Sequence, residues 1–278
     1  MESHTAELIK QAAASARQHE DAVRGQLEQA GRIREFWERL SDEVDSPASL
    51  LLTLHRSGPV LDQLRGKNEQ LLAAIQAART EAEVKAGEAA KTFIWSFPAA
   101  IRDAAISPDK TSRHPKYTFR EGFIRLDIDD RAFTARISPR DGQETTVGLD
   151  VPVVVQKLVA EEARLFRRPF PDQLLRSVYT AYTACLKAER VGDAEEVPLR
   201  RLVNRLAKNL NRFAADEFNV DFAQLIKSGK VVIDGMRMHL NHTRHARVGM
   251  LLHGLEEGGY VGFVSFKKEE QRNDNQPA

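Results

Sequence analysis

The segment from Pro59 to Thr92 has the most regular apolar pattern in this 278-residue chain. Its positions recur in alternating steps of three and four residues, which places them on one face of a helix and is typical of a heptad repeat. The face consists of Leu61, Leu64, Asn68, Leu71, Ile75, Ala78, Ala82, Lys85 and Ala89. Such a face needs a second helix to cover it, either from this chain or from another protein.

An earlier part of the chain offers a covering helix. Apolar residues recur at helical spacing from Ser3 to Leu40, and Ser46-Pro47 marks the start of a short helix that follows. We predict that the Ser3–Leu40 and Pro59–Thr92 helices fold antiparallel as a coiled-coil arm over residues 1–106. The alternative is association with a second copy or a partner protein. In that case the contact residues are Leu61, Leu64, Leu71 and Ile75.

From Tyr117 the apolar pattern changes from helical spacing to the alternation of strands. Phe123–Ile128 and Ala132–Ile137 predict a hairpin around Asp129–Arg131, and Thr145–Leu149 predicts a third strand. We therefore predict an α+β protein, in which the helical arm is followed by a mixed α/β domain with short antiparallel hairpins. This domain spans residues 116–268, and residues 269–278 form a polar, disordered tail.

The second half of the mixed domain alternates helices and strands. Helices are predicted after Asp150 through Phe166, around Leu175–Leu186, over Leu199–Ala215 and from Thr243 to Gly258. The dipeptide Asp234-Gly235 lies between two short apolar runs and is the strongest short hairpin signal of the chain. A last strand is predicted over Tyr260–Phe266.

One short segment resembles a known family. Leu251–Val261, with the sequence LLHGLEEGGYV, is similar to the end of a winged-helix recognition helix that enters its wing. The hairpin upstream and the lack of a second wing strand depart from the order of that family. No function is carried over from this resemblance.

Bulk properties exclude several classes of protein. The net charge is +1, so electrostatic recognition must come from local clusters of charge. Cys185 is the single cysteine, which excludes an internal disulfide framework and fits a reducing compartment. No run of 18 apolar residues and no secretory signal occur, so we expect a cytoplasmic protein without a membrane span.

A stripe of cations is the first candidate site. In the predicted helix Leu199–Ala215, apolar residues occupy one face and cations spaced four, three and four apart occupy the other. Like charges at this spacing destabilise a helix, so an anionic ligand such as nucleic-acid phosphate is favoured. The alternative is a solvated face, or pairing with carboxylates elsewhere in the chain. The candidate phosphate-binding residues are Arg201, Arg205, Lys208 and Arg212, with Arg237, Arg244 and Arg247 further along.

Two other groups of residues are candidates for a catalytic site. His239, His242 and His245 have a spacing that permits metal binding, but the arginines between them disfavour a cation. Asp127 and Asp129 are paired carboxylates that also suit a simple hairpin turn. No phosphate loop or nucleophile elbow occurs, and Cys185 lies on an apolar helix face. We assign no catalytic residue, metal ligand or cofactor.

The sequence therefore predicts a non-enzymatic, partner-binding subunit of a nucleic-acid-associated complex. The arm is expected to dock a protein partner or a second copy, and the cations to contact nucleic acid, with DNA favoured over RNA. The first alternative is a protein–protein scaffold whose basic helix meets an acidic protein surface. The second is a metal-dependent phosphoesterase or nuclease that uses Asp127, Asp129 and the three histidines.

Overall fold

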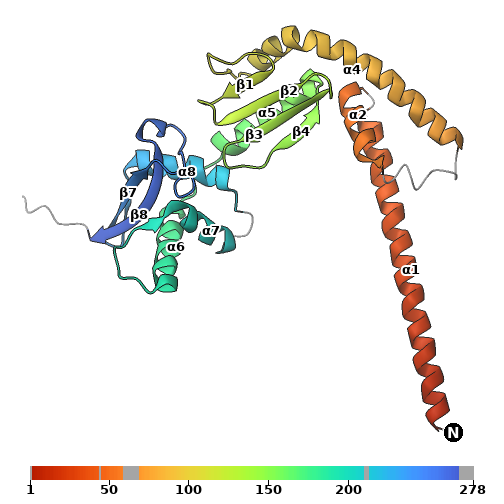
Figure 1. The fold of residues 1–278 in the computed structure, drawn as a ribbon, viewed down its shortest axis with the longest axis horizontal. Helices are drawn as coiled ribbons and strands as arrows, with labels where there is room; N and C mark the ends of the chain where they lie inside the picture. The colour runs from red at the N-terminus through yellow and green to blue at the C-terminus, as the bar shows by residue number, and fades with distance from the viewer. Residues whose placement is uncertain (1, 44, 59–68, 210–212, 269–278) are drawn as a thin grey trace, which may run out of the picture. The chain divides into compact units, whose positions relative to one another are not determined.

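The computed structural model describes residues 2–43, 45–58, 69–209 and 213–268 (Figure 1). Contacts along the chain divide it into two compact units. The first contains Met1–Ala100, Ile128–Ala135 and Val147–Val154, and the second contains Ile101–Asp127, Arg136–Thr146 and Val155–Ala278. The prediction of a mixed α+β protein is confirmed. No helix in the described ranges is both long and apolar enough to cross a membrane.

The described residues at the start of the chain form α1 (Glu2–Asp42), α2 (Pro47–Arg56) and α4 (Glu69–Asp103). They share a small apolar core, in which Phe36 of α1 and Leu50 and Leu54 of α2 pack with Ala82 of α4. Pro47 occupies the first turn of α2, as its fixed φ angle favours. The three helices therefore meet where α1 ends.

The start of α2 is capped by a carboxylate from a distant part of the chain. Asp150 accepts hydrogen bonds from the backbone N–H groups of Ala48 and Ser49, at 3.2 and 2.7 Å, and from the Ser49 hydroxyl at 2.7 Å. A negative charge at a helix N-terminus satisfies free N–H groups and complements the helix dipole. Gly148 lies so close that a Cβ atom there would be 2.2 Å from the Ser49 nitrogen.

The extended antiparallel pairing predicted for the arm is not confirmed. On α1, Val23 is 50% and Leu27 is 73% exposed, so none of the described residues covers this part of its apolar face. On α4, Ile75 and Ala82 contribute to the small core as the heptad predicts. Packing therefore covers only part of the predicted face.

Other positions of the predicted heptad differ or cannot be assigned. Ala78 and Lys85 are exposed on α4. Leu61 and Leu64 lie outside the described residues, and the side chain of Leu71 is not described either. The predicted partner contact therefore rests on Ile75 alone within the described part of the face.

The first sheet has the strand order β1-β2-β3-β4. Its strands are β1 (Lys116–Phe119), β2 (Ile124–Asp129), β3 (Thr134–Pro139) and β4 (Thr145–Gly148). Strands β1 and β2 are antiparallel, with Lys116 opposite Asp127 and Phe119 opposite Ile124. The predicted strands around the Asp129–Arg131 turn are confirmed, although β3 begins two residues later than expected. Helix α5 (Val151–Phe166) follows as predicted.

The other described residues of the second unit form helices α6, α7 and α8 and a second sheet (Figure 1). Helix α6 (Leu174–Glu189), strand β5 (Val197–Pro198), α7 (Leu199–Asn209) and α8 (Ala215–Ser228) come first. Strands β6 (Val232–Ile233), β7 (Met236–Thr243) and β8 (Tyr260–Lys268) follow, with a 3₁₀ turn η1 (Glu256–Gly258) before β8. The sheet order is β5-β8-β7-β6, and all pairs are antiparallel.

One hairpin prediction is confirmed, one helix prediction is confirmed over most of its length, and one helix prediction is wrong. Asp234 and Gly235 connect β6 to β7, and both have positive φ, as a type I′ turn requires. The predicted helix Leu199–Ala215 is present over Leu199–Asn209, residues 210–212 lie outside the described residues, and α8 begins at Ala215. The predicted helix Thr243–Gly258 is mostly loop, because Thr243 still pairs with Tyr260 and Met250 bridges to Val261.

Candidate functional site

The order of elements from α6 to β8 defines a known type of connectivity. Helix, strand, two helices and two strands follow one another, and the last strand, β8, lies between β5 and β7. The same order of elements, without β6, occurs in winged helix-turn-helix domains. In helix-turn-helix proteins the second helix of the pair enters the major groove of DNA, and α8 takes this place here.

The segment that carries the sequence resemblance does not contain the end of an α-helix. Leu251–Val261 was matched to the end of a recognition helix, whereas it lies in the loop between β7 and β8 and in the start of β8. Strands β7 and β8, which flank this loop, form an antiparallel pair.

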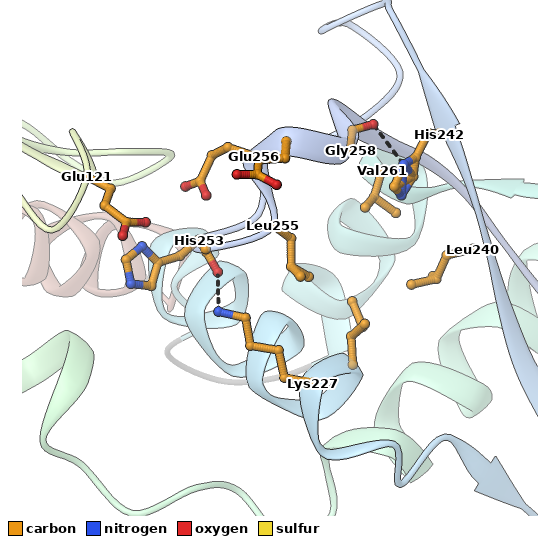
Figure 2. Close-up of a pocket in the computed structure, with 12 residues that line it drawn as sticks. Glu121, Lys227, Leu240, His242, His253, Leu255, Glu256, Gly258 and Val261 are labelled. Carbon is orange, nitrogen blue, oxygen red and sulfur yellow. Dashed lines mark hydrogen bonds between the residues drawn. The ribbon is translucent and has the colours of Figure 1, made fainter.

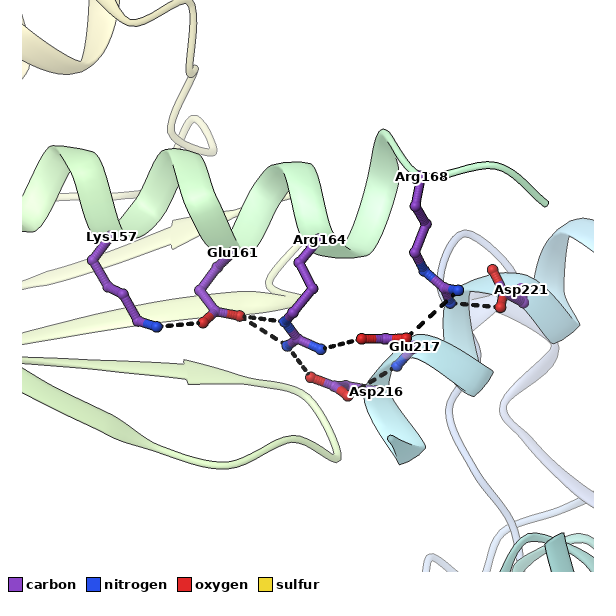
Figure 3. Close-up of polar contacts among 7 residues, drawn as sticks. All are labelled: Lys157, Glu161, Arg164, Arg168, Asp216, Glu217 and Asp221. Carbon is purple, nitrogen blue, oxygen red and sulfur yellow. Dashed lines mark hydrogen bonds and ion pairs between the residues drawn. The ribbon is translucent and has the colours of Figure 1, made fainter. Parts of the chain in front are cut away.

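Helix α8 has an acidic face that is already occupied within the second unit. Its carboxylates lie opposite Phe218 and Phe222, which face the core. Figure 3 shows Arg164 of α5 between Asp216 and Glu217, and Arg168 directed to Asp221. The bond from Arg164 to Glu217 measures 2.9 Å and that from Arg168 to Asp221 measures 2.5 Å.

The network continues along α5. Glu161 accepts hydrogen bonds from Arg164 at 2.9 Å and pairs with Lys157 at 2.8 Å. Burial alone would raise the pKa of Glu161, but these cations lower it overall. The pKa of Arg164 is raised despite its partial burial, because three carboxylates accept its hydrogen bonds. The polar face of α8 is thus held by fixed ion pairs and is negatively charged, which is unsuited to DNA phosphates.

A basic groove lies on the neighbouring helix α7. It encloses about 320 Å³, with a floor of Ala184, Cys185 and Ala188 from α6. Its cationic lining consists of Arg201, Arg205 and Lys208, with Asn204. The predicted amphipathic arrangement is present, since Leu199, Leu202, Val203 and Leu206 are buried on the other face.

The cations of this groove differ in their partners. Arg201 pairs with Glu189 of α6. Arg205 and Lys208 are exposed, and no ion pair of theirs occurs among the residues that the structure describes. Arg212, the fourth predicted cation, lies outside the described residues. Burial raises the pKa of the Cys185 thiol beneath them, and Arg201 and Arg205 oppose this effect. Cys185 is therefore a core residue, as predicted.

The loop after β7 is attached to the start of α7. The Arg200 backbone N–H donates to the Val248 carbonyl at 3.3 Å, and its Nε donates to the Ala246 carbonyl at 2.7 Å. Arg244 and Arg247 are exposed on this loop. Five of the predicted cations therefore lie on α7 or on the loop that is bonded to it. Three of them line the groove and two are on the loop.

Arg237 does not belong to this group. It lies near the Asp234-Gly235 turn, whereas Arg244 follows the opposite end of β7. At about 3.3 Å per residue, the two backbone positions are roughly 20 Å apart. Arg237 is half-buried and engaged in contacts of its own.

The histidines and aspartates of the enzyme alternative are not brought together. His239 and His242 pair with Ser265 and Val261 on β8, and a bulge separates their positions. His242 Nδ1 lies 2.8 Å from the Gly258 carbonyl oxygen. Asp129 accepts from the backbone of Arg131 and Ala132, which confirms its role in the turn. In the described ranges, none of these residues joins a group of three metal-ligating side chains.

A pocket that sequence reasoning missed lies beside the loop between β7 and β8. It measures about 780 Å³ and is lined by Glu121, His253, Glu256 and Glu257, among others. Figure 2 shows the Glu121 carboxylate next to a ring nitrogen of His253. Among the described residues, Glu121, His253 and Glu256 form the group of potential metal ligands, with one ligand atom from each within 4.8 Å of the others. The local spacing His253-x-x-Glu256 was a visible signal, but Glu121 comes from a distant turn.

Protonation states in this pocket follow from burial and charge. Burial lowers the pKa of His253, although Glu256 and Glu121 oppose this, so the neutral imidazole is favoured. Burial would raise the pKa of Glu256, but the hydrogen bond from Arg140 helps to lower it overall. At neutral pH the pocket therefore holds an uncharged imidazole beside ionised Glu256.

Comparison with known proteins adds no relative. No family model, curated protein or solved structure matches the chain. The functional argument therefore depends on the geometry of the described residues.

Proposed function

We propose that the protein is a non-enzymatic, nucleic-acid-associated subunit that contacts phosphate through α7 and the loop attached to it. The supporting observation is the contrast in charge between α7 and α8. Arg205, Lys208, Arg244 and Arg247 are exposed cations, and the described residues give none of them a carboxylate partner. Exposed cations without internal partners are the electrostatic footprint of phosphate binding.

The covered face of α8 determines which kind of binding is proposed. A helix that reads bases must enter the major groove with donors and acceptors free. The polar face of α8 is acidic and bonded to Arg164 and Arg168, so it offers no such surface. We therefore propose backbone contact without base readout. The winged-helix connectivity favours duplex DNA over RNA by analogy of fold.

The test is fluorescence anisotropy of labelled duplex DNA and RNA with the full chain over a salt series. Each phosphate contact is expected to contribute about −0.9 to the slope of log affinity against log salt. Charge reversal of Arg205 and Lys208 to Glu is expected to weaken binding. Arg125→Glu with Arg136→Glu, on exposed positions of β2 and β3, makes the same change in net charge and serves as the control.

Two results would overturn this proposal. One is an absence of nucleic-acid binding at low salt. This result would favour the protein-scaffold alternative, in which an acidic surface of a partner protein contacts α7. The other is an equal loss of affinity in the α7 variant and the β2/β3 control, which would mean that net charge alone drives binding.

A second part of the proposal concerns assembly through the helices of the first unit. Apolar side chains are exposed on both long helices: Val23 and Leu27 on α1, and Val84 and Trp95 on α4. Val84 and Trp95 are eleven residues apart, or about three helical turns, and so share a face. Trp95 is 79% exposed, and exposed tryptophan is characteristic of protein interfaces. We propose that a second copy of the chain covers these positions.

Light scattering over a concentration series tests this assembly. Leu27→Ser and Trp95→Ser are expected to shift the protein toward monomer, whereas Glu28→Ser, next to Leu27, is the control. A protein that is monomeric at all concentrations would leave the exposed face to a different protein partner and overturn self-association.

A further inference from the structure

The group formed by Glu121, His253 and Glu256 draws its members from three separate segments. Glu121 lies in the turn between β1 and β2, His253 in the loop after β7, and Glu256 begins η1. Local sequence alone does not require these three side chains to meet. Their convergence at one pocket is therefore a property of the folded second unit.

The imidazole of His253 is fixed on several sides. Its ring makes edge contacts with Phe123 at 5.3 Å and Phe166 at 4.9 Å between centroids. Its backbone N–H donates to the side chain of the fully buried Asn219 at 2.9 Å. The ring is therefore held in place before any ligand arrives, which favours a defined binding geometry.

One polar atom of this ring lacks a partner. The Nδ1 atom of His253 is buried and makes no hydrogen bond to any described residue. A buried nitrogen without a partner costs free energy, and such atoms are rare in folded proteins. Figure 2 shows a ring nitrogen directed to the side of the pocket where Glu121 lies. A cation between the imidazole and the carboxylates would satisfy this lone pair.

The two carboxylates are also held in place. The backbone N–H groups of Glu121 and Gly122 donate to Asp109 at 3.0 and 2.8 Å, which fixes the turn but leaves the Glu121 carboxylate exposed. Arg140 donates to one oxygen of Glu256 at 2.9 Å. This hydrogen bond also orients the second carboxylate oxygen of Glu256. Hydrogen bonds commonly orient carboxylates that bind metals in this way.

The charge of the pocket permits a cation. Its lining includes three carboxylates, on Glu121, Glu256 and Glu257, and one ammonium group, on Lys227. Lys227 is directed to the His253 carbonyl oxygen at 3.5 Å, and Arg140 also donates to the Leu251 carbonyl. Both neighbouring cations thus have acceptors of their own, and the pocket keeps a net negative charge.

The geometry points to a binding site for one divalent transition-metal ion, with His253, Glu121 and Glu256 as its protein ligands. One imidazole and two carboxylates are a ligand set that suits Zn²⁺ and Mn²⁺. Three protein ligands leave further positions open, and these face the 780 Å³ pocket, where water or a small anionic ligand fits. The enzyme alternative of the sequence placed its metal on other histidines, so this site is distinct from it.

The test is calorimetric titration of metal-free full-length protein with ZnCl₂ and MnCl₂, with MgCl₂ as a comparison. We expect one ion of Zn²⁺ per chain at this site and a rise in melting temperature on binding. Glu121→Gln removes one ligand from an exposed position and is expected to weaken binding by about tenfold or more. Glu257→Gln, on the same pocket but outside the ligand group, is expected to bind as the wild type does.

Controls separate this site from surface histidines and from unfolding. His245→Gln removes an exposed histidine and is expected to leave this binding unchanged. His253→Gln tests the central ligand, and circular dichroism verifies its fold. The proposal is overturned if the wild type binds no metal, or if Glu121→Gln binds as tightly as Glu257→Gln.

Discussion

Helices α7 and α8 follow each other in the chain and pack on the same core, yet their polar faces differ in charge and in the contacts they make. The polar face of α7 carries exposed cations, two of which have no ion pair among the described residues. The polar face of α8 carries carboxylates that are bonded to Arg164 and Arg168. In a helix-turn-helix pair the second helix reads DNA. Here the polar face of α8 is bonded to Arg164 and Arg168, and the exposed cations lie on α7.

This contrast teaches that connectivity and function can separate. The elements follow the order found in a winged helix, but the polar face of α8 is bonded to Arg164 of α5 and to Arg168. Substitutions on α8 contacts should therefore change stability, and substitutions on α7 should change binding. The predictions below test that division.

The largest effect is expected for Arg164→Ala. This change leaves Asp216, whose side chain is 4% exposed, without its main cation. Removing one partner of a buried pair costs about 3–5 kcal/mol, and we expect about 3 because the Arg164 side chain is itself 35% exposed. Urea unfolding measures the change. Arg176→Ala, which removes an exposed pair at 3.9 Å, is the control and is expected to cost about 0.5 kcal/mol or less.

The second prediction concerns α7. The double variant Arg205→Glu, Lys208→Glu should reduce the salt slope of DNA binding by about two units and weaken affinity at low salt by about tenfold or more. Its free energy of unfolding should stay within about 0.5 kcal/mol of the wild type, because both side chains are exposed. A loss of stability comparable to that of Arg164→Ala would contradict the division between the two helices.

The contrast between α7 and α8 also shows where sequence reasoning succeeded. The apolar face of α7 and the start of α5 follow from helical spacing, and the hairpin at Asp234-Gly235 follows from turn chemistry. Helix α8 was missed because Asp216, Asn219 and Asp221 are buried beside its apolar residues, which removes the polar–apolar alternation around the helix. Their burial depends on partners from α5 and on loops that lie far away in the chain.

The candidate sites divide in the same way. The cations of α7 lie on one helix, so their spacing in the sequence predicts that they share a face. Arg237 was predicted to act with them, but it lies at the opposite end of β7 from Arg244. The pocket ligands needed a tertiary contact between Glu121 and His253. Local patterns place residues on one face of an element, but they do not show which elements meet.

A third prediction tests how tightly the acidic face of α8 is packed. A Cβ atom on Gly142 would lie 2.4 Å from Asp216 Oδ2, and the Arg164 ion pair prevents this carboxylate from moving away freely. Gly142→Ala is therefore expected to destabilise the protein by about 1–2 kcal/mol. Gly192→Ala, where a Cβ meets nothing within 4 Å, is the matched control. Equal stability of the two variants would mean that the α8 face has room to adjust.

The smallest effect is a pH dependence that originates in α5. The pKa of Glu161 lies below its ordinary value of 4.5: burial alone would raise it, but the hydrogen bonds from Lys157 and Arg164 outweigh that effect. Between these two pKa values the unfolded chain binds more protons at this position than the folded chain does. The stabilisation of the folded chain by ionised Glu161 is thus complete above about pH 4.5. It is lost as the pH falls through the pKa that Glu161 has in the folded chain.

Urea unfolding from pH 7 to pH 3.5 measures this contribution. The groups that face Glu161 are Lys157 and Arg164, and Arg164 also binds Asp216 and Glu217 of α8. Burial raises the pKa of Asp221, which acts in the opposite direction, so the comparison must be made between variants. Glu161→Gln should lose less stability on acidification than the wild type, whereas the exposed Glu257→Gln should follow the wild type. Parallel curves for Glu161→Gln and the wild type would mean that the ion pairs of Glu161 do not stabilise the α5 surface that holds α8.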